Sequence, residues 1–225
     1  MVKKEVTKKA PAKKAAIKKA PIKKAVTKDV AVKKSEVTKK TPKRDITVVN
    51  IVVSTSLEHE IPLERMAATL SNTEYNPEQF PGLVIRIKEP KTSALIFSSG
   101  KVVCTGARSM DKVYLSIKKI IKSLEKINVK IKIEPIVKIQ NIVASGSVGM
   151  DLNLNVLAMK LDNTEYEPEQ FPGLVYKLPA AKATFLLFSN GKIVCTGTKS
   201  EAEVHIALEK LIEQLEKVVP KKNKK

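Results

Sequence analysis

The side chains that most often carry out covalent or metal chemistry are few in this chain, and their spacing supports neither kind of chemistry. Its two histidines, His59 and His205, do not occupy equivalent positions in the repeat described below. Its two cysteines, Cys104 and Cys195, lack CxxC spacing, and their symmetric placement is unlike a secretory disulfide framework. No G-x-S-x-G, HExxH or P-loop motif occurs. We therefore expect no enzyme activity, no metal and no cofactor, and reduced, structural thiols in an intracellular protein.

Side chains suited to binding, by contrast, recur in pairs 91 positions apart. Four of the five phenylalanines form two such sets, Phe80 with Phe97 and Phe171 with Phe188, each set separated by 17 positions. These pairs belong to a duplication of a whole folding unit. NTEYNPEQFPGLV begins at position 72 and NTEYEPEQFPGLV at position 163, and residues 50–126 match residues 141–217 at 37 of 77 positions without a gap.

Each unit must supply the elements that position these side chains. Residues 46–57 are rich in β-branched residues and predict a strand, and residues 62–70 predict a short helix with a proline in its first turn. Residues 72–81 are polar and proline-containing, which predicts a loop. Strands at 83–88, 92–98 and 101–106, with a tight turn at Ser99-Gly100, precede a helix over 110–127 that Ser109 is expected to cap. The second unit repeats this order.

Helices that cover one face of each half-sheet leave the other face open, and the two halves are expected to join edge to edge as an intramolecular pseudo-dimer. Strand alternation assigns side chains to the open face. They are Asn50, Val52, Ser54, Leu95, Phe97, Val103 and Thr105, with their copies Asn141, Val143, Ser145, Leu186, Phe188, Val194 and Thr196. Such a large apolar face predicts an interface.

The doubled FPGLV…LxFSxGKxVCTG pattern resembles the TATA-box-binding protein family over essentially all of residues 45–219. The resemblance implies an α+β fold in which two tandem, nearly identical repeats form a saddle. The saddle would have a curved ten-stranded antiparallel sheet and four helices on its convex side. It also implies a general transcription initiation factor that binds the TATA box in the DNA minor groove as a monomer.

The resemblance further assigns roles to individual residues. Asn50 and Asn141, with Thr105 and Thr196, would form hydrogen bonds to base acceptors near the centre of the site. The two phenylalanine pairs would insert between base steps at its two ends and kink the duplex. The implied DNA-binding set is Asn50, Val52, Phe80, Pro81, Leu95, Phe97, Val103, Thr105, Asn141, Val143, Phe171, Pro172, Leu186, Phe188, Val194 and Thr196.

Two further sets follow from the same resemblance. Phosphate contacts are expected from Arg86, Lys88, Lys91, Lys101, Lys177, Lys182 and Lys192. The loops 76–81 and 167–172 match the family's stirrups, in which Glu167 and Glu169 would bind transcription factor B and so recruit RNA polymerase indirectly. The first loop has Asn76 in place of Glu167, a difference that could make the partner choose one side.

Positive charge is concentrated at the two ends of the chain. Of the formal net charge of +19, residues 1–44 carry +14, from 17 Lys/Arg and 3 Asp/Glu, and the last four lysines add +4. We predict a disordered basic tail at 1–44, the two repeats at 45–132 and 133–219, and a basic tail at 220–225. The lysine-rich segment is suited to DNA phosphates, although solubility alone could explain it.

Two features of the sequence bear on its source. Both repeats read FPGLV, and they are unusually alike, which is similar to archaeal members of the family; those members often lack a long basic arm. No apolar run is long enough for a membrane helix, and no secretory signal is present. The expected location is the archaeal cytoplasm or nucleoid, or the nucleus in a eukaryote.

Three alternative readings remain open. DNA glycosylases contain related units, but their catalytic helical domain has no counterpart here. A sheet for single strands or RNA would carry its aromatic residues at strand centres, whereas these lie in pairs toward the ends. A scaffold that binds proteins alone would not require the symmetric phenylalanines.

Overall fold

The computed structural model describes residues 45–218, and the predictions for residues 1–44 and 219–225 lie outside this range. The described part contains two copies of one unit. The first consists of β1 (Asp45–Ser56), α1 (Leu63–Thr69), β2 (Thr73–Glu74), β3 (Gly82–Ile87), β4 (Thr92–Phe97), β5 (Lys101–Ala107) and α2 (Met110–Glu125). The second consists of β6 (Lys138–Ser147), α3 (Leu154–Lys160), β7 (Thr164–Glu165), β8 (Leu174–Leu178), the short 3-10 helix η1 (Pro179–Ala181), β9 (Ala183–Leu187), β10 (Lys192–Thr198) and α4 (Glu201–Val218).

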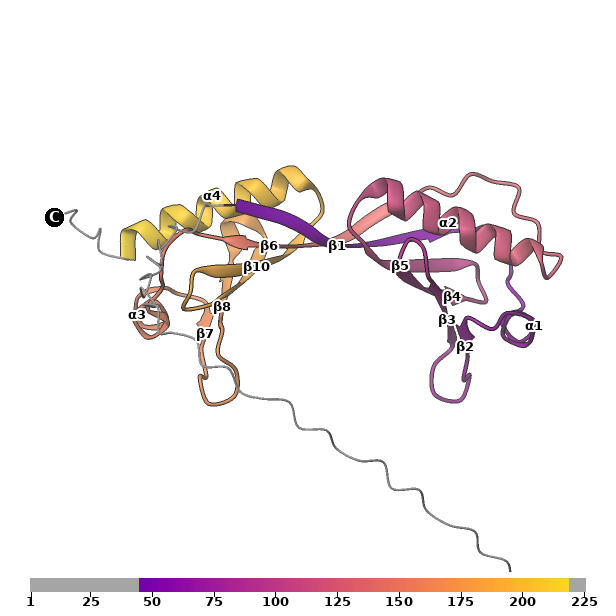
Figure 1. Ribbon diagram of the computed structural model, residues 1–225, viewed down its shortest axis with the longest axis horizontal. Coiled ribbons are helices and arrows are strands. Elements are labelled where there is room, and N and C mark those ends of the chain that lie inside the picture. The colour runs from indigo at the N-terminus through magenta and orange to yellow at the C-terminus, as the bar shows by residue number, and fades with distance from the viewer. Residues whose placement is uncertain (1–44, 219–225) are drawn as a thin grey trace, which may run out of the picture. The chain divides into compact units, whose positions relative to one another are not determined.

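All ten strands form one antiparallel sheet, in the order β2-β3-β4-β5-β1-β6-β10-β9-β8-β7. The two units join through β1 and β6, where Ile51 lies opposite Ile142, its own repeat equivalent. A pseudo-two-fold axis therefore passes through this pair. Figure 1 shows a curved sheet that does not close on itself, with α2 and α4 along the same face. The predicted fold class, a duplicated α+β unit with a ten-stranded sheet and four α-helices, is confirmed.

A single hydrophobic core lies between the sheet and the helices. In α2, Val113, Ile117, Ile120 and Leu124 are buried at helical spacing, and Ile51 and Val53 of β1 are buried beneath the same layer. The opposite face of the sheet carries no helix within residues 45–218. Because side chains alternate along each strand, the helices bury one set against the core and leave the other set on the uncovered face.

Three local predictions differ from the structure. The loop expected at 72–81 contains the two-residue edge strand β2, whose residue Thr73 pairs with Ile85; strands this short leave no periodicity to read. Pro62 occupies the N-cap of α1 rather than its first turn. Ser109 is the N-cap residue of α2, but its side chain makes no capping hydrogen bond.

Candidate nucleic-acid interface

The uncovered face of the sheet is defined by strict alternation in the inner strands. In β4, Leu95 and Phe97 are half-buried while Ile96 between them is fully buried, and in β5 Val103 and Thr105 flank the buried Cys104. The second repeat shows the same pattern. The structure therefore places the predicted inner-strand residues of both repeats on one face, facing away from the core.

In the two central strands, β1 and β6, the alternation of side chains is interrupted, and the sequence pattern alone does not show where. The register between β1 and β6 shifts between Val48 and Asn50, and shifts again at the equivalent place in β6. Before the shift Ile46 and Val48 pack against the core; after it Ile51 and Val53 do so. Each shift is a β-bulge, which redirects the following side chains. Asn50 and Asn141 each follow such a bulge, close to the pseudo-two-fold axis.

The Asn50 side-chain amide is held in one orientation by its neighbours. Its Oδ1 accepts the backbone N–H of Gly106 at 2.7 Å, and its Nδ2 lies 3.1 Å from Thr105 Oγ1. Because a backbone N–H can only donate, the oxygen must face Gly106, and the NH₂ group is fixed on the other side. One of its two hydrogens points to the threonine, which leaves the second available for a ligand.

The second repeat reproduces this arrangement. Asn141 Oδ1 accepts the Gly197 N–H at 2.8 Å, and Asn141 Nδ2 lies 3.0 Å from Thr196 Oγ1. Gly106 and Gly197 adopt φ of +96° and +99°, a region that favours glycine, so the backbone N–H that orients each amide depends on that residue type. The face thus presents two oriented hydrogen-bond donors related by pseudo-symmetry, surrounded by apolar side chains.

The two phenylalanine pairs lie toward the ends of the same face. Phe80 and Phe97 have ring centroids 5.9 Å apart at 63°, and Phe171 and Phe188 have centroids 6.1 Å apart at 63°. Phe80 and Phe171 remain 44% and 45% exposed, whereas the fifth phenylalanine, Phe185, is fully buried in the core. Exposed aromatic rings cost hydration free energy, so a symmetric pair of them indicates a binding function.

A glycine supports each pair of rings. A Cβ atom on Gly82 would stand 2.6 Å from Phe80 Cε1 and 3.2 Å from Phe97 Cε1, and Gly173 has the same relation to Phe171 and Phe188. Any larger residue would displace the exposed ring. The FPG sequence therefore lets the first phenylalanine fold back over its own strand. Pro81 and Pro172, the residues between, are exposed beside the rings.

The predicted phosphate-binding residues all have exposed side chains. Four of them, Arg86, Lys101, Lys177 and Lys192, lie in strands at positions that alternate with buried residues, on the open face. The structure adds partners that the sequence did not indicate, because they come from the edge strands. Arg86 forms an ion pair with Glu74 at 3.0 Å, and Lys177 forms one with Glu165 at 2.7 Å.

The main effect of these ion pairs is on the pKa values of the two glutamates. The hydrogen bond and the charge of Arg86 lower the pKa of Glu74, and those of Lys177 lower the pKa of Glu165. Both pairs are well exposed, so water screens them and they can open when a phosphate competes. The remaining five predicted cations form no ion pair among those found in residues 45–218.

Some open-face residues were missing from the predicted DNA-binding set. Val84 and Val175 are half-buried and lie opposite Leu95 and Leu186, and alternation from Leu83 and Leu174 would have identified them. Gln140, the bulge residue of β6, donates from Nε2 to Ser54 Oγ at 2.7 Å and so lies on this face as well. No sequence signal marks Gln140, because its position depends on the bulge.

Glu167 and Glu169 are exposed in the loop between β7 and β8. The backbone N–H groups of Gln170 and Phe171 donate to the Glu167 carbonyl, which closes a turn that contains both glutamates. The equivalent loop of the first repeat has the same turn at Asn76. The two loops therefore differ in charge but not in backbone hydrogen bonding.

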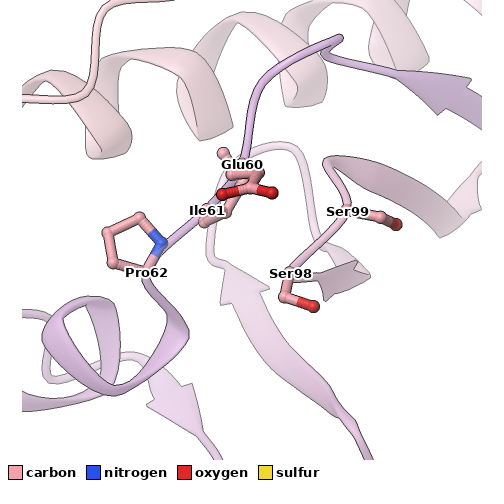
Figure 2. Close-up of a pocket in the computed structure, with 5 residues that line it drawn as sticks. All are labelled: Glu60, Ile61, Pro62, Ser98 and Ser99. Atoms are coloured by element: carbon pink, nitrogen blue, oxygen red, sulfur yellow. The ribbon is translucent and has the colours of Figure 1, made fainter.

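Other concave or reactive positions lie apart from these residues. A hollow of about 540 Å³ beside the β4–β5 turn is lined by Glu60, Ile61, Pro62, Ser98 and Ser99, and includes none of the predicted DNA-binding residues (Figure 2). His59 and His205 are both exposed.

The two cysteines are buried in the core, where burial raises both thiol pKa values, that of Cys195 to about 11. No cluster of three or more potential metal ligands occurs within residues 45–218. In the same range no helix is long and apolar enough to cross a membrane.

An antiparallel sheet with paired exposed aromatics, oriented amides and peripheral cations is the arrangement of a nucleic-acid-binding protein. Residues 45–127 and 136–218 each match the family model described as transcription factor TFIID, or TATA-binding protein. A TATA-box-binding protein of Methanocaldococcus jannaschii is 49% identical over 174 residues, which cover 77% of this chain and 95% of that protein. One of Archaeoglobus fulgidus is 48% identical over 172 residues, covering 76% and 94%.

A solved structure, named as the TBP of Methanococcus jannaschii, superimposes with a TM-score of 0.73 at 49% identity, covering 77% of this chain and 99% of that one. The chain belongs to the TATA-binding protein family. The resemblance found in the sequence is thereby confirmed, and so is the prediction that the chain is not an enzyme, since the family is one of transcription factors.

Proposed function

We propose that this chain is a general transcription initiation factor that binds the TATA box through the minor groove. It would kink the duplex by inserting its two phenylalanine pairs, and would recruit transcription factor B and, through it, RNA polymerase. Family membership supports the initiation role. The observation that carries the DNA-binding mechanism is the symmetric set of two exposed phenylalanine pairs flanking two oriented asparagine amides.

The chemistry of the face suits A·T base pairs. In the minor groove these pairs offer acceptors, adenine N3 and thymine O2, whereas G·C pairs add the guanine amino donor. The free N–H of each asparagine amide is a donor for such acceptors. The valine and leucine side chains around it cannot accept a hydrogen bond, so a guanine amino group buried against them would stay unpaired, at a cost of about 1–3 kcal/mol.

The phenylalanine pairs would supply the bend. Inserting apolar side chains between base steps costs a few kcal/mol for each step, and the wider groove then contacts more of the apolar face. TATA-binding proteins are themselves the best-known example of this behaviour. Phe80 and Phe171, each half exposed above a glycine, have the freedom to enter a base step.

The outer parts of the face would hold the phosphates and the next factor. Five of the predicted cations are exposed and take part in none of the ion pairs found in residues 45–218, so no carboxylate competes with a phosphate for them: Lys88, Lys91, Lys101, Lys182 and Lys192. The Glu167 and Glu169 carboxylates would bind a basic surface of transcription factor B. We place this activity inside the cell, on genomic DNA.

Energy transfer across an end-labelled duplex tests the proposal. A duplex with a TATA box should bring its ends together when the protein binds, and a G·C-rich duplex at the same salt should not. Replacing Phe80 and Phe171 by alanine should reduce the approach of the ends while the fold persists. Equal binding to both duplexes without bending would refute the function.

Recruitment needs a separate measurement. Glu167→Lys combined with Glu169→Lys should abolish binding of transcription factor B to the protein–TATA complex but leave bending unchanged. The matched variant in the first loop is Asn76→Lys with Glu78→Lys, which should retain the factor. Loss of the factor with both pairs of variants would argue against a contact restricted to the second loop.

A further inference from the structure

The two long helices carry opposite charge, although they occupy equivalent places in the two repeats. Residues 110–127, which contain α2, hold five lysines and two acidic residues, a formal net charge of +3. Residues 201–218, which form α4, hold five glutamates and two lysines, a formal net charge of −3. Both helices bury an apolar stripe in the core, so their charged faces point away from the sheet.

The charge is reversed at matched positions of the two helices. Lys118 is the repeat equivalent of Glu209, and Lys122 is the repeat equivalent of Glu213. All four side chains are exposed, and none of them takes part in the ion pairs found in residues 45–218. Their charges are therefore available to a partner.

The other charged positions do not cancel this difference. Lys119 and its equivalent Lys210 have the same sign, and each donates to a backbone carbonyl of its own repeat, that of Glu89 or Ala180. Positions 125 and 126 match 216 and 217 in charge. The difference between the helices thus arises at three matched positions, which are Lys112, Lys118 and Lys122 in α2 and Glu203, Glu209 and Glu213 in α4.

An exposed aliphatic side chain lies beside these charges on each helix. Leu115 of α2 is 44% exposed, and its equivalent in α4, Ile206, is 49% exposed. In both helices the reversed charges follow at three and seven positions, which places them on the same helical face as the aliphatic residue. Single exposed aliphatic residues are common, but a matched pair set among opposite charges is what a self-complementary surface requires.

The surface beside Leu115 is concave. It forms a hollow of about 500 Å³ whose lining includes Lys88, Glu89, Lys91, Arg108, Lys112 and Leu115. Four cations and one carboxylate surround this hollow, so it suits an aliphatic side chain with acidic neighbours. Ile206 has such neighbours, because Glu203 and Glu209 lie three positions before and after it.

A second copy of this chain offers the complement to both helices at once. Figure 1 shows α2 and α4 along the same face of the sheet. Two copies can face each other with these helices, related by a two-fold axis perpendicular to the line that joins α2 and α4. The α2 helix of each copy then lies against α4 of the other, and the interface closes after two copies. An unrelated acidic protein would match α2 alone and leave the negative face of α4 uncovered.

We propose that two copies of this chain associate through the exposed faces of α2 and α4, with α2 of each copy against α4 of the other. Leu115 and Ile206 provide the apolar contacts, and the reversed charges provide the ion pairs. Residues 45–220 have a formal net charge of only +1, so this part of the two copies repels little.

The association leaves the candidate nucleic-acid interface free in both copies, because α2 and α4 lie on the opposite side of the sheet. A pair of copies would therefore hold two duplexes. This consequence rests on the proposed minor-groove function, whereas the association itself does not.

Two charge variants of the full chain test the association. Glu209→Lys with Glu213→Lys makes both helices basic, and Lys118→Glu with Lys122→Glu makes both acidic. Glu203 is left unchanged, because its Oε2 accepts the backbone N–H of Lys199 at the start of α4.

The matched control is Glu60→Lys with Glu78→Lys, which adds the same charge at exposed residues outside both helices. Leu115→Gln with Ile206→Gln is a further variant that removes the apolar contacts without a change of charge. It keeps the test decisive if a charge variant does not fold, which thermal unfolding reports.

Sedimentation at about 0.15 M salt, where the screening length is about 8 Å, measures dimer formation from about 1 to about 100 µM protein. We expect the unmodified chain and the control to form dimers in this range. Each charge variant alone, and the glutamine variant, should associate at least about tenfold more weakly. An equimolar mixture of the two charge variants should form dimers again, because each basic helix of one then meets an acidic helix of the other.

An unmodified chain that stays monomeric at about 100 µM would overturn the proposal. Dimers that persist in both charge variants would overturn it too, and would indicate association through the open face of the sheet. A mixture of folded charge variants that does not form dimers would exclude the proposed pairing of α2 with α4.

Sedimentation with a labelled TATA duplex separates this proposal from the minor-groove function. Dimers that show no preference for the TATA duplex over a G·C-rich duplex would refute the minor-groove function but not the association. Complexes that bend the TATA duplex but contain one copy and one duplex at about 100 µM would refute the association and leave the minor-groove function intact.

Discussion

Asn141, which the second repeat contributes near the centre of the open face, offers a sharp test, because aspartate has the same shape but no N–H. Asn141 Oδ1 accepts from Gly197 N–H at 2.8 Å, and Thr196 Oγ1 lies within 3.3 Å of it. A carboxylate can accept from both groups, so Asn141→Asp preserves the internal hydrogen bonds. What changes is the group that faces the ligand, which turns from a donor into an acceptor.

The size of the expected effect follows from this exchange. The lost hydrogen bond to a base contributes about 0.5–1.5 kcal/mol, and the base acceptor left unpaired against a carboxylate costs about 1–3 kcal/mol more. The sum of about 1.5–4.5 kcal/mol corresponds to a complex about 12- to 1,600-fold weaker at 1.4 kcal/mol per tenfold change. The free protein should lose less than about 1 kcal/mol, which shifts Tm by no more than about 4 °C.

Titration of a fluorescent TATA duplex measures the first quantity, and thermal unfolding followed by circular dichroism measures the second. Asn50→Asp should give a similar loss, since its amide has the same partners. Asn153→Asp is the matched control: Asn153 accepts from Val156 N–H at the start of α3, where aspartate caps equally well, so DNA affinity should not change.

The reasoning would be refuted if Asn141→Asp bound the TATA duplex as tightly as the unmodified protein, with a normal Tm. In that case the amide donor would not face the bases. A loss of affinity accompanied by a large fall in Tm would instead show that the carboxylate disrupts the fold, and Asn141→Ser, which keeps a donor, would then be expected to bind better than Asn141→Asp.

Two further substitutions and a test of the native cysteines have defined outcomes. Gly173→Ala would place a Cβ atom 2.6 Å from Phe171 Cε1, so the ring should shift. Duplex bending, measured by energy transfer, should then fall while the protein stays folded. Unchanged bending would exclude a supporting role for the glycine. Thr198 is buried, and its Oγ1 has no hydrogen-bond partner within residues 45–218. Thr198→Val should therefore stabilise the protein by about 1 kcal/mol and raise Tm by about 2–4 °C. A lower Tm would contradict this. Cys104 and Cys195 are buried, so they should not react with a thiol reagent at pH 8 until the protein is denatured. The folded state also keeps the pKa of Cys195 near 11, above its unfolded value, so the free energy of unfolding should decline as pH rises from about 9 to 11. An unfolding free energy that stays constant over this pH range would argue against this.

Much of the interface was accessible from the sequence because the duplication provides an internal check. Alternation alone assigns Leu95 and Phe97 to one face, but the recurrence of the same residue types 91 positions later excludes coincidence. The buried Ile96 and the half-buried neighbours on either side confirm this assignment. The order of strands and helices was likewise predictable, since each has its own periodicity.

Other features depended on contacts that no local pattern encodes. The bulge before Asn50 reverses the alternation of β1, so Val48 and Ile51 both face the core although they are three positions apart. The ion pair of Arg86 arises because the edge strand β2 brings Glu74 next to it. The bulge and the ion pair both depend on how strands distant in sequence pair with one another, and the sequence of a single strand does not contain that information.

The sequence by itself determined the duplicated unit, the two phenylalanine pairs and most of the open face, because side-chain type and period 2 or 3.6 sort buried from exposed positions wherever a strand has no bulge. Tertiary structure alone decided the direction of each asparagine amide, through a backbone N–H of a distant glycine. It also decided that Asp45 lies within the second repeat, beside Phe188 and Lys192. These are relations between strands that lie 55 or more positions apart, and the pairing of the whole sheet sets them.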